Sequence, residues 1–195
     1  ARAAEGEPLA YLTGEREFFG LAFEMTPDVL IPRPETEELV EHALARAREM
    51  SSCDAGSAGP HIVDLGTGSG CIAVTLAARL ERALVYATDV SSQALSLAAE
   101  NAKRHGVAAR IRFLREDLFS AGRAAPWADL VVSNPPYIPS ALIPSLEPEI
   151  RREPRLALDG GPDGLAAIRA VAAQAGRLLK AGGLLLLEFG DGQAV

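Results

Sequence analysis

Apolar and polar positions follow two spacings along this chain, one typical of buried strands and one typical of helices. Short apolar runs that predict strands cover residues 61–65, 83–88, 110–114, 129–132 and 184–189. After the first two runs, and again before the last one, apolar residues recur at helical spacing. Strands that alternate with helices in this way predict a mainly parallel sheet with helices on both faces. We therefore expect a doubly wound α/β fold.

Two helices at the borders of this pattern can be placed more closely. The first is expected to begin at Pro34, to carry three glutamates in its first turn, and to run to about Arg48. The second is expected over residues 165–180, where Gly182 and Gly183 would end it. Both present a row of apolar residues that would face the sheet.

The first 34 residues show a different pattern. Residues 8–14 predict a short helical turn that ends at Gly14, and residues 17–25 predict two short strands on either side of Gly20. The aromatic residues of this β-hairpin could cover one end of the core or form a docking surface for a partner. The sequence thus predicts a small unit at 1–34 and a main domain at 35–195.

A glycine-rich loop follows the strand at 61–65 and precedes a helix. It consists of Gly66, Thr67, Gly68, Ser69 and Gly70. Glycines let a ligand approach the main chain, and the start of a helix points free N–H groups at it. The spacing departs from the dinucleotide fingerprint, because that pattern needs glycine where Cys71 stands. The loop alone therefore predicts a nucleotide-type pocket only weakly.

Acidic residues at the ends of the next two strands strengthen this prediction. Asp89 lies about 20 residues after the loop, where a carboxylate can accept hydrogen bonds from both ribose hydroxyls. Its alternative role is a negative charge at the start of a helix capped by Ser91 and Ser92. Asp117 could bind an adenine amino group while Leu118 packs on the ring.

The strand at 129–132 ends in the motif Asn134-Pro135-Pro136-Tyr137. Asn134 offers an amide oxygen, Pro135 offers only its carbonyl, and Tyr137 brings a flat ring, a set that suits a planar NH2 group. A rigid turn after a strand is the alternative reading. Ligands of parallel sheets bind at the carboxyl ends of strands, so Gly66, Asp89, Asp117 and Asn134 are expected to face one cleft.

Composition narrows the classes of protein that remain. The chain has 195 residues, 48% of them hydrophobic, and no apolar run approaches the ~20 residues of a membrane span. No signal peptide is recognisable, so a cytoplasmic location is expected. The net charge of −7 disfavours a nucleic acid as the main partner. Two cysteines and three scattered histidines predict no metal site.

These motifs carry a resemblance. The stretch DLGTGSG at 64–70, Asp89, Asp117-Leu118 and the Asn-Pro-Pro-Tyr motif resemble the Rossmann-like class I S-adenosylmethionine-dependent methyltransferases. That last motif is shared by enzymes that methylate NH2 groups, including some DNA adenine and ribosomal RNA guanine methyltransferases. Residues 8–20, 30–37, 152–161 and 188–193 resemble the HemK family, the glutamine methyltransferases of peptide-chain release factors.

The resemblance implies a cofactor, a substrate and a set of site residues. The cofactor would be S-adenosyl-L-methionine, and the partners would be class 1 release factors, methylated on the glutamine of their Gly-Gly-Gln motif. Substrate-binding residues would be Asn134, Pro135, Pro136 and Tyr137, with Asn134, Pro135 and Tyr137 catalytic. Cofactor-binding residues would be Gly66, Thr67, Gly68, Ser69, Gly70, Asp89, Asp117, Leu118 and Asn134.

Family members usually have a helical N-terminal domain and two more strands after the one at 184–189. We therefore expect that this sequence is a fragment, or the ordered part, of a longer protein, with its last strand at the edge of the sheet. Two other functions stay open: an amino methyltransferase of nucleic acids, and a noncatalytic module that binds release factors.

Overall fold

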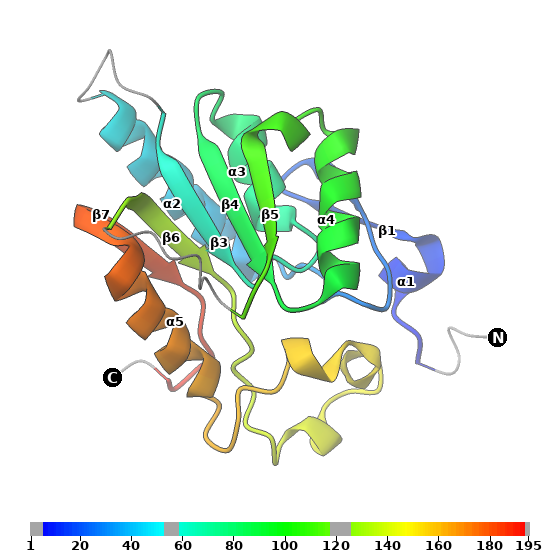
Figure 1. Ribbon diagram of the computed structural model, residues 1–195. Coiled ribbons are helices and arrows are strands. Elements are labelled where there is room, and N and C mark those ends of the chain that lie inside the picture. The colour runs from blue at the N-terminus through cyan, green and yellow to red at the C-terminus, as the bar shows by residue number, and fades with distance from the viewer. Residues whose placement is uncertain (1–5, 53–58, 118–125, 194–195) are drawn as a thin grey trace.

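A five-stranded parallel sheet forms the centre of the computed structural model, which describes residues 6–52, 59–117 and 126–193 (Figure 1). The strands are β3 (His61–Leu65), β4 (Leu84–Asp89), β5 (Ile111–Arg115), β6 (Ala128–Ser133) and β7 (Leu179–Leu187). Their spatial order is β5-β4-β3-β6-β7, and all four neighbouring pairs are parallel. The predicted α/β architecture is confirmed.

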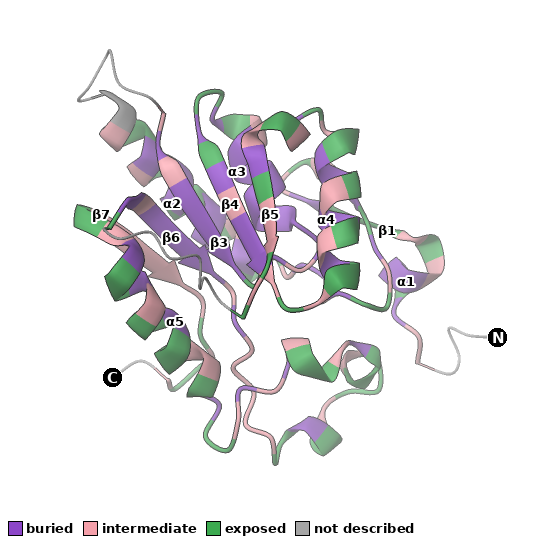
Figure 2. Ribbon diagram, viewed as in Figure 1, coloured by how far each residue is buried: buried purple, intermediate pink, exposed green. Residues whose placement is uncertain are grey.

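Helices cover both faces of the sheet. They are α2 (Glu35–Ser52), α3 (Cys71–Arg79), α4 (Ser92–Arg104) and α5 (Ala166–Leu178). Side chains of α2, α3 and α4 share one apolar cluster with Ile62 of β3, whereas α5 packs on the opposite face against Val63. Successive strand residues point to opposite faces, which is why two neighbours in β3 belong to different clusters. Figure 2 shows the buried residues concentrated in the central strands and the inner sides of these helices.

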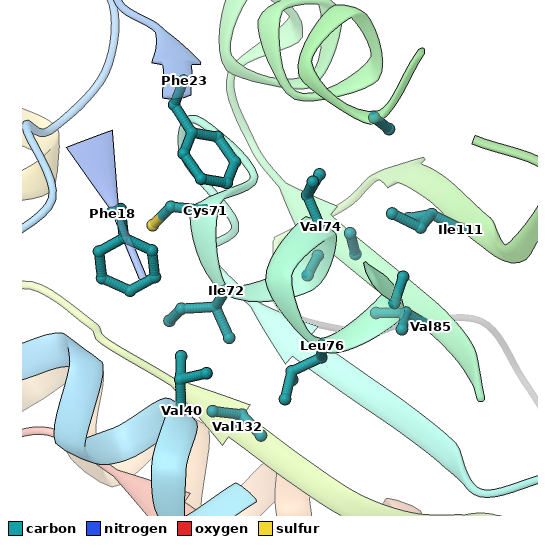
Figure 3. Close-up of a cluster of buried hydrophobic side chains, with 14 of the residues drawn as sticks. Phe18, Phe23, Val40, Cys71, Ile72, Val74, Leu76, Val85, Ile111 and Val132 are labelled. Carbon is teal, nitrogen blue, oxygen red and sulfur yellow. The ribbon is translucent and has the colours of Figure 1, made fainter. Parts of the chain in front are cut away.

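The N-terminal segment folds as predicted and packs on the same core. It contains α1 (Leu9–Thr13) and an antiparallel hairpin of β1 (Glu15–Phe18) and β2 (Leu21–Glu24). Phe18 and Phe23 are buried in one cluster with Cys71 of α3 (Figure 3). The side chain of Asn101 on α4 accepts a hydrogen bond from Glu24 N at 2.8 Å and donates one to Glu24 O at 3.1 Å. The hairpin thus covers one end of the core; a unit boundary at residue 34 stays a prediction.

The border between α5 and β7 differs from the expectation. The helix ends at Leu178, so Leu179 and Lys180 belong to β7 instead of the helix, and Gly182 and Gly183 lie within the strand. Trp127 N donates to Leu178 O at 2.9 Å, and Leu179 pairs with Ala128, so contact with β6 overrides the local helical pattern. The register shifts beyond Ala128, where Gly182 has a φ of 80°. The helix α2 also extends past the predicted Arg48.

Short 3-10 helices complete the described elements. They cover Ala108–Arg110, Ile143–Ser145, Ile150–Arg152 and Arg155–Ala157. The last three lie in the segment between β6 and α5, on the side of the sheet where the strands end (Figure 1). Within the described residues β7 pairs only with β6, so the predicted edge position of this apolar strand is confirmed.

Candidate functional site

The carboxyl ends of β3, β4, β5 and β6 open on one cavity of about 410 Å³. Predicted site residues that line it are Gly66, Thr67, Gly68, Ser69, Asp89, Asp117, Asn134, Pro135 and Pro136. The expectation that four strand ends face a single cleft is therefore confirmed. Helix α2 and the segment after β6 supply further walls.

The glycines of the loop have different tasks. Gly66 and Gly68 have left-handed φ values of 76° and 56°, and a Cβ added at either would meet no atom within 4 Å. Both therefore leave the main chain accessible from the cavity. Gly70 has a φ of 81°, but its added Cβ would lie 2.9 Å from Ala98 Cβ, and it does not line the cavity. Its task is close packing of α3 against α4.

Asp89 has the predicted role at the start of a helix and also holds the glycine loop, whereas its predicted ribose contact stays a prediction. Its carboxylate accepts a hydrogen bond from Gly68 N at 2.9 Å and one from Ser91 N at 3.0 Å, at the start of α4. Ser91 itself caps this helix by accepting from Ala94 N at 3.2 Å. Asp89 also lines the cavity, and a carboxylate has lone pairs beyond the two used here. It can therefore hold the glycine loop and still face a ligand.

A second aspartate lies beneath the loop. Asp64 is fully buried at the end of β3 and accepts a hydrogen bond from Thr67 Oγ1 at 2.7 Å. Burial raises the pKa of the Asp64 carboxyl to about 7, and the nearby charge of Asp89 adds to the rise. Sequence reasoning gave Asp64 no role beyond its place in the DLGTGSG stretch.

Asn134 belongs to a chain of hydrogen bonds that reaches back to α2. Its Nδ2 donates to Thr36 Oγ1 at 3.0 Å, and Thr36 Oγ1 donates to Glu188 Oε2 at 2.7 Å. Tyr137 Oη donates to Glu188 Oε1 at 3.4 Å. Burial raises the pKa of Glu188, and the hydrogen bonds from Thr36, Tyr137 and Asn134 oppose that rise.

Thr36 and Glu188 were missed as individual site residues, although both lie in stretches that carried the resemblance. Glu188 directly follows β7, as Asp89 ends β4 and Asn134 follows β6. The sequence predicts this strand to run to residue 189, so the strand-end rule selects Glu188 only once the structure shows that β7 ends at Leu187. No comparable signal marked Thr36, which looks like an ordinary residue in the first turn of a helix.

Two predicted site residues, Tyr137 and Gly70, do not line the cavity. Tyr137 is not among the lining residues, and its hydroxyl points to Glu188. Burial and the charge of Glu188 raise the pKa of Tyr137. Gly70 packs on α4, as described above. Leu118 lies outside the described residues, so its predicted adenine contact is not tested.

The segment between β6 and α5 is anchored beside the cavity. The side chain of Glu153 is buried and accepts hydrogen bonds from Ile31 N at 2.9 Å and from the Arg33 guanidinium at 2.5 Å. Pro154 and Leu156 line the cavity, and the Leu156 side chain is largely exposed. This segment therefore forms a wall of the site with apolar surface near its entrance.

The described residues hold neither a metal-binding cluster nor a membrane-spanning helix. They contain no cluster of three or more histidine, cysteine or acidic side chains able to hold a metal ion. Nor does that part of the chain include a helix long and apolar enough to cross a bilayer.

Known proteins similar to this chain in sequence are methyltransferases. Residues 49–143 match the model of the methyltransferase small domain. Release factor glutamine methyltransferases of Moorella thermoacetica, Burkholderia pseudomallei and Bordetella pertussis are 52%, 49% and 49% identical over the whole of this chain. The chain spans 66%, 67% and 68% of these three relatives, about two thirds of their length.

Solved structures show the same fold at low identity. A SAM-dependent methyltransferase from Agrobacterium tumefaciens has a TM-score of 0.61 at 18% identity over 92% of this chain and 53% of its own. The hMettl16 catalytic domain in complex with the MAT2A 3'UTR hairpin 1 has a TM-score of 0.60 at 17% identity over 82% of this chain and 57% of its own.

Proposed function

We propose that this chain methylates the glutamine side-chain nitrogen in the Gly-Gly-Gln motif of class 1 release factors, with S-adenosyl-L-methionine as methyl donor. The chain belongs to the family of release factor glutamine methyltransferases. One observation carries the proposal: the glycine loop with Asp89 and the Asn134-Pro135-Pro136 motif line the same cavity. A methyl donor and a methyl acceptor bound at these two places would share one cavity.

The residues around the glycine loop fit this cofactor. The main chain at Gly66 and Gly68 is open to the cavity, where it can approach a ligand closely. Asp89 would accept from the ribose hydroxyls, and Asp117 would accept from the adenine amino group. A cavity of about 410 Å³ falls in the range of small-molecule sites. When bound, S-adenosylmethionine supplies an electrophilic methyl group on a sulfonium.

The other end of the cavity fits a primary carboxamide. The side-chain oxygen of Asn134 and the carbonyl of Pro135 would each accept one hydrogen of the substrate NH2 group. A carboxamide nitrogen is a poor nucleophile because its lone pair is shared with its carbonyl. Fixing the nitrogen in line with the methyl group can supply roughly 7 to 11 kcal/mol of the barrier reduction in favourable systems.

The same two acceptors also favour the transition state over the ground state. As the new bond forms, the substrate nitrogen gains positive charge, and hydrogen bonds to oxygen acceptors become stronger. Pro136 and the apolar segment near Leu156 would help keep water out of the cavity. The proton can leave to water, so the mechanism needs no general base among the side chains.

The proposal is tested by methyl transfer from labelled cofactor to three targets: a release factor, the same factor with its Gly-Gly-Gln glutamine replaced by alanine, and adenine-containing DNA or RNA. We expect label only in the release factor that retains its Gly-Gly-Gln glutamine. Label in nucleic acid would favour the amino methyltransferase alternative, and binding without transfer would favour the noncatalytic module. A protein with this substrate would work in the cytoplasm, and the net charge of −7 does not favour direct nucleic acid binding.

Asn134→Ala separates catalysis from cofactor binding in this assay. Losing one positioned hydrogen-bonding group costs about 100-fold or more in turnover in comparable sites, so we expect a loss of that size. Cofactor affinity, measured by calorimetry, should change little. Near wild-type methylation of the release factor by this variant would contradict the mechanism.

A further inference from the structure

We propose that Thr36 and Glu188 are positioning residues for the proposed methyl transfer, because together they fix which end of the Asn134 side-chain amide faces the cavity. The inference rests on the proposed function and deepens it. An asparagine side chain fits its site in two orientations that exchange the oxygen and the NH2 group. Only one of them presents an acceptor to a substrate NH2 group.

Three segments far apart in sequence meet at this amide. Thr36 is the second residue of α2 and is 2% exposed. Glu188 follows β7, and its backbone N donates to Ser133 O at 3.1 Å, which places it directly beside Asn134 at the end of the sheet. Helix, strand end and motif therefore hold the three side chains at fixed positions on separate elements.

The direction of the hydrogen bonds follows from the chemistry of each group. When Glu188 is ionised, its carboxylate only accepts, so the Thr36 hydroxyl then points its single hydrogen at Glu188, 2.7 Å away. The Thr36 oxygen is then left to accept from its other neighbour, Asn134, at 3.0 Å. The group of Asn134 that donates there is its NH2, so its oxygen is directed away from Thr36. Asn134 also lines the cavity, where that oxygen can accept from a substrate.

Tyr137 completes the arrangement from a third side. Its hydroxyl donates to the other carboxylate oxygen of Glu188 at 3.4 Å, so both oxygens of Glu188 accept from side chains of the site. Two other ionisable groups near Glu188 are Glu35 on α2, whose charge adds to the rise of the Glu188 pKa, and Cys71 on α3. The orientation of Asn134 thus depends on two residues that the substrate need not touch.

The test compares Thr36→Val, which removes the hydroxyl at nearly constant volume, with Thr36→Ser, which keeps it. The matched control is Thr75→Val on α3, because Thr75 is equally buried and its hydroxyl has no hydrogen-bond partner in the described structure. All variants are made in the full-length protein and assayed for kcat and for the KM of cofactor and release factor. Nuclear magnetic resonance of the Asn134 side-chain NH2, assigned with Asn134→Ala, reports hydrogen exchange of the amide itself.

We expect Thr36→Val to lower kcat by about 10- to 100-fold, as misplacement of a reacting group can do, with little change in the cofactor KM. Its Asn134 amide hydrogens should exchange faster than in the wild type. Thr36→Ser should stay within about threefold of the wild-type kcat, the range expected when the positioned group is retained, and Thr75→Val should match the wild type in both measurements.

Wild-type kcat and wild-type amide exchange in Thr36→Val would overturn the inference. An equal loss in Thr36→Ser would overturn it as well, since packing and not the hydroxyl would then be responsible. If the wild-type protein methylates no release factor, the proposed function fails, yet the exchange measurement still decides whether Thr36 orients Asn134. The two failures are therefore distinguishable.

Discussion

Asp64 offers a quantitative test of how the glycine loop is held, through the variant Asp64→Asn. The carboxyl is buried beneath the loop, accepts a hydrogen bond from Thr67, and has its pKa raised from 3.8 to about 7. Asparagine has nearly the same shape, carries no charge, and can still accept from the Thr67 hydroxyl. The substitution therefore removes the buried charge. It also replaces one buried carboxylate oxygen by an NH2 group, a change whose cost does not vary with pH.

The sign of the effect follows from the two pKa values. Below pH about 4 the Asp64 carboxyl is protonated in the folded and the unfolded protein, so it adds nothing to the pH dependence. Between that pH and about 7, the folded protein keeps the proton while the unfolded chain releases it. The free energy of unfolding therefore falls as pH rises through this window. Above it, the full cost of the buried charge is present.

The gap between 3.8 and about 7 corresponds to roughly 4 kcal/mol. We expect the stability of Asp64→Asn relative to the wild type to increase by up to about that amount between pH 4 and pH 8.5. Urea unfolding at a series of pH values measures the difference. Glu81→Gln, at an exposed carboxylate, is the control. A stability difference between Asp64→Asn and the wild type that does not change with pH would refute the reasoning.

Three further predictions concern the loop and the core. Asp89→Ala should weaken cofactor binding in calorimetry, and unchanged cofactor affinity would contradict the ribose contact. The same variant should lower stability by about 2 to 4 kcal/mol, because two backbone N–H groups lose a charged acceptor. Gly70→Ala should cost at least about 1 to 2 kcal/mol in urea unfolding, from its left-handed φ and the 2.9 Å approach to Ala98. Wild-type stability would show that α3 and α4 can separate. Phe23→Ala should cost about 3 to 5 kcal/mol in thermal unfolding, since this ring is fully buried; a loss below 1 kcal/mol would mean that the hairpin is not part of the core.

Most helices and strands of this chain are encoded locally. The strands β3 to β6, the helices after β3 and β4, and the N-terminal hairpin lie where spacing and turn residues placed them, within a few residues. Each depends on residues that are neighbours in the sequence, such as Gly20, which has a left-handed φ of 74° in the hairpin turn. The start of β7 does not depend on sequence neighbours, because pairing of Leu179 with Ala128 places residues that would continue a helix in a strand.

The same division applies to the site. The glycine loop, Asp89, Asp117 and Asn134 could be identified from the sequence, because each follows or ends a predicted strand and parallel strands end at one edge of a sheet. The orientation of Asn134 could not be predicted from the sequence, since Thr36 and Glu188 stand 98 residues before it and 54 after it in the chain. The raised pKa of Asp64 could not be predicted either, because it depends on complete burial of the carboxyl. Sequence patterns determine which elements form and which chemical groups end them; only the tertiary structure decides which distant groups meet and how much water they lose.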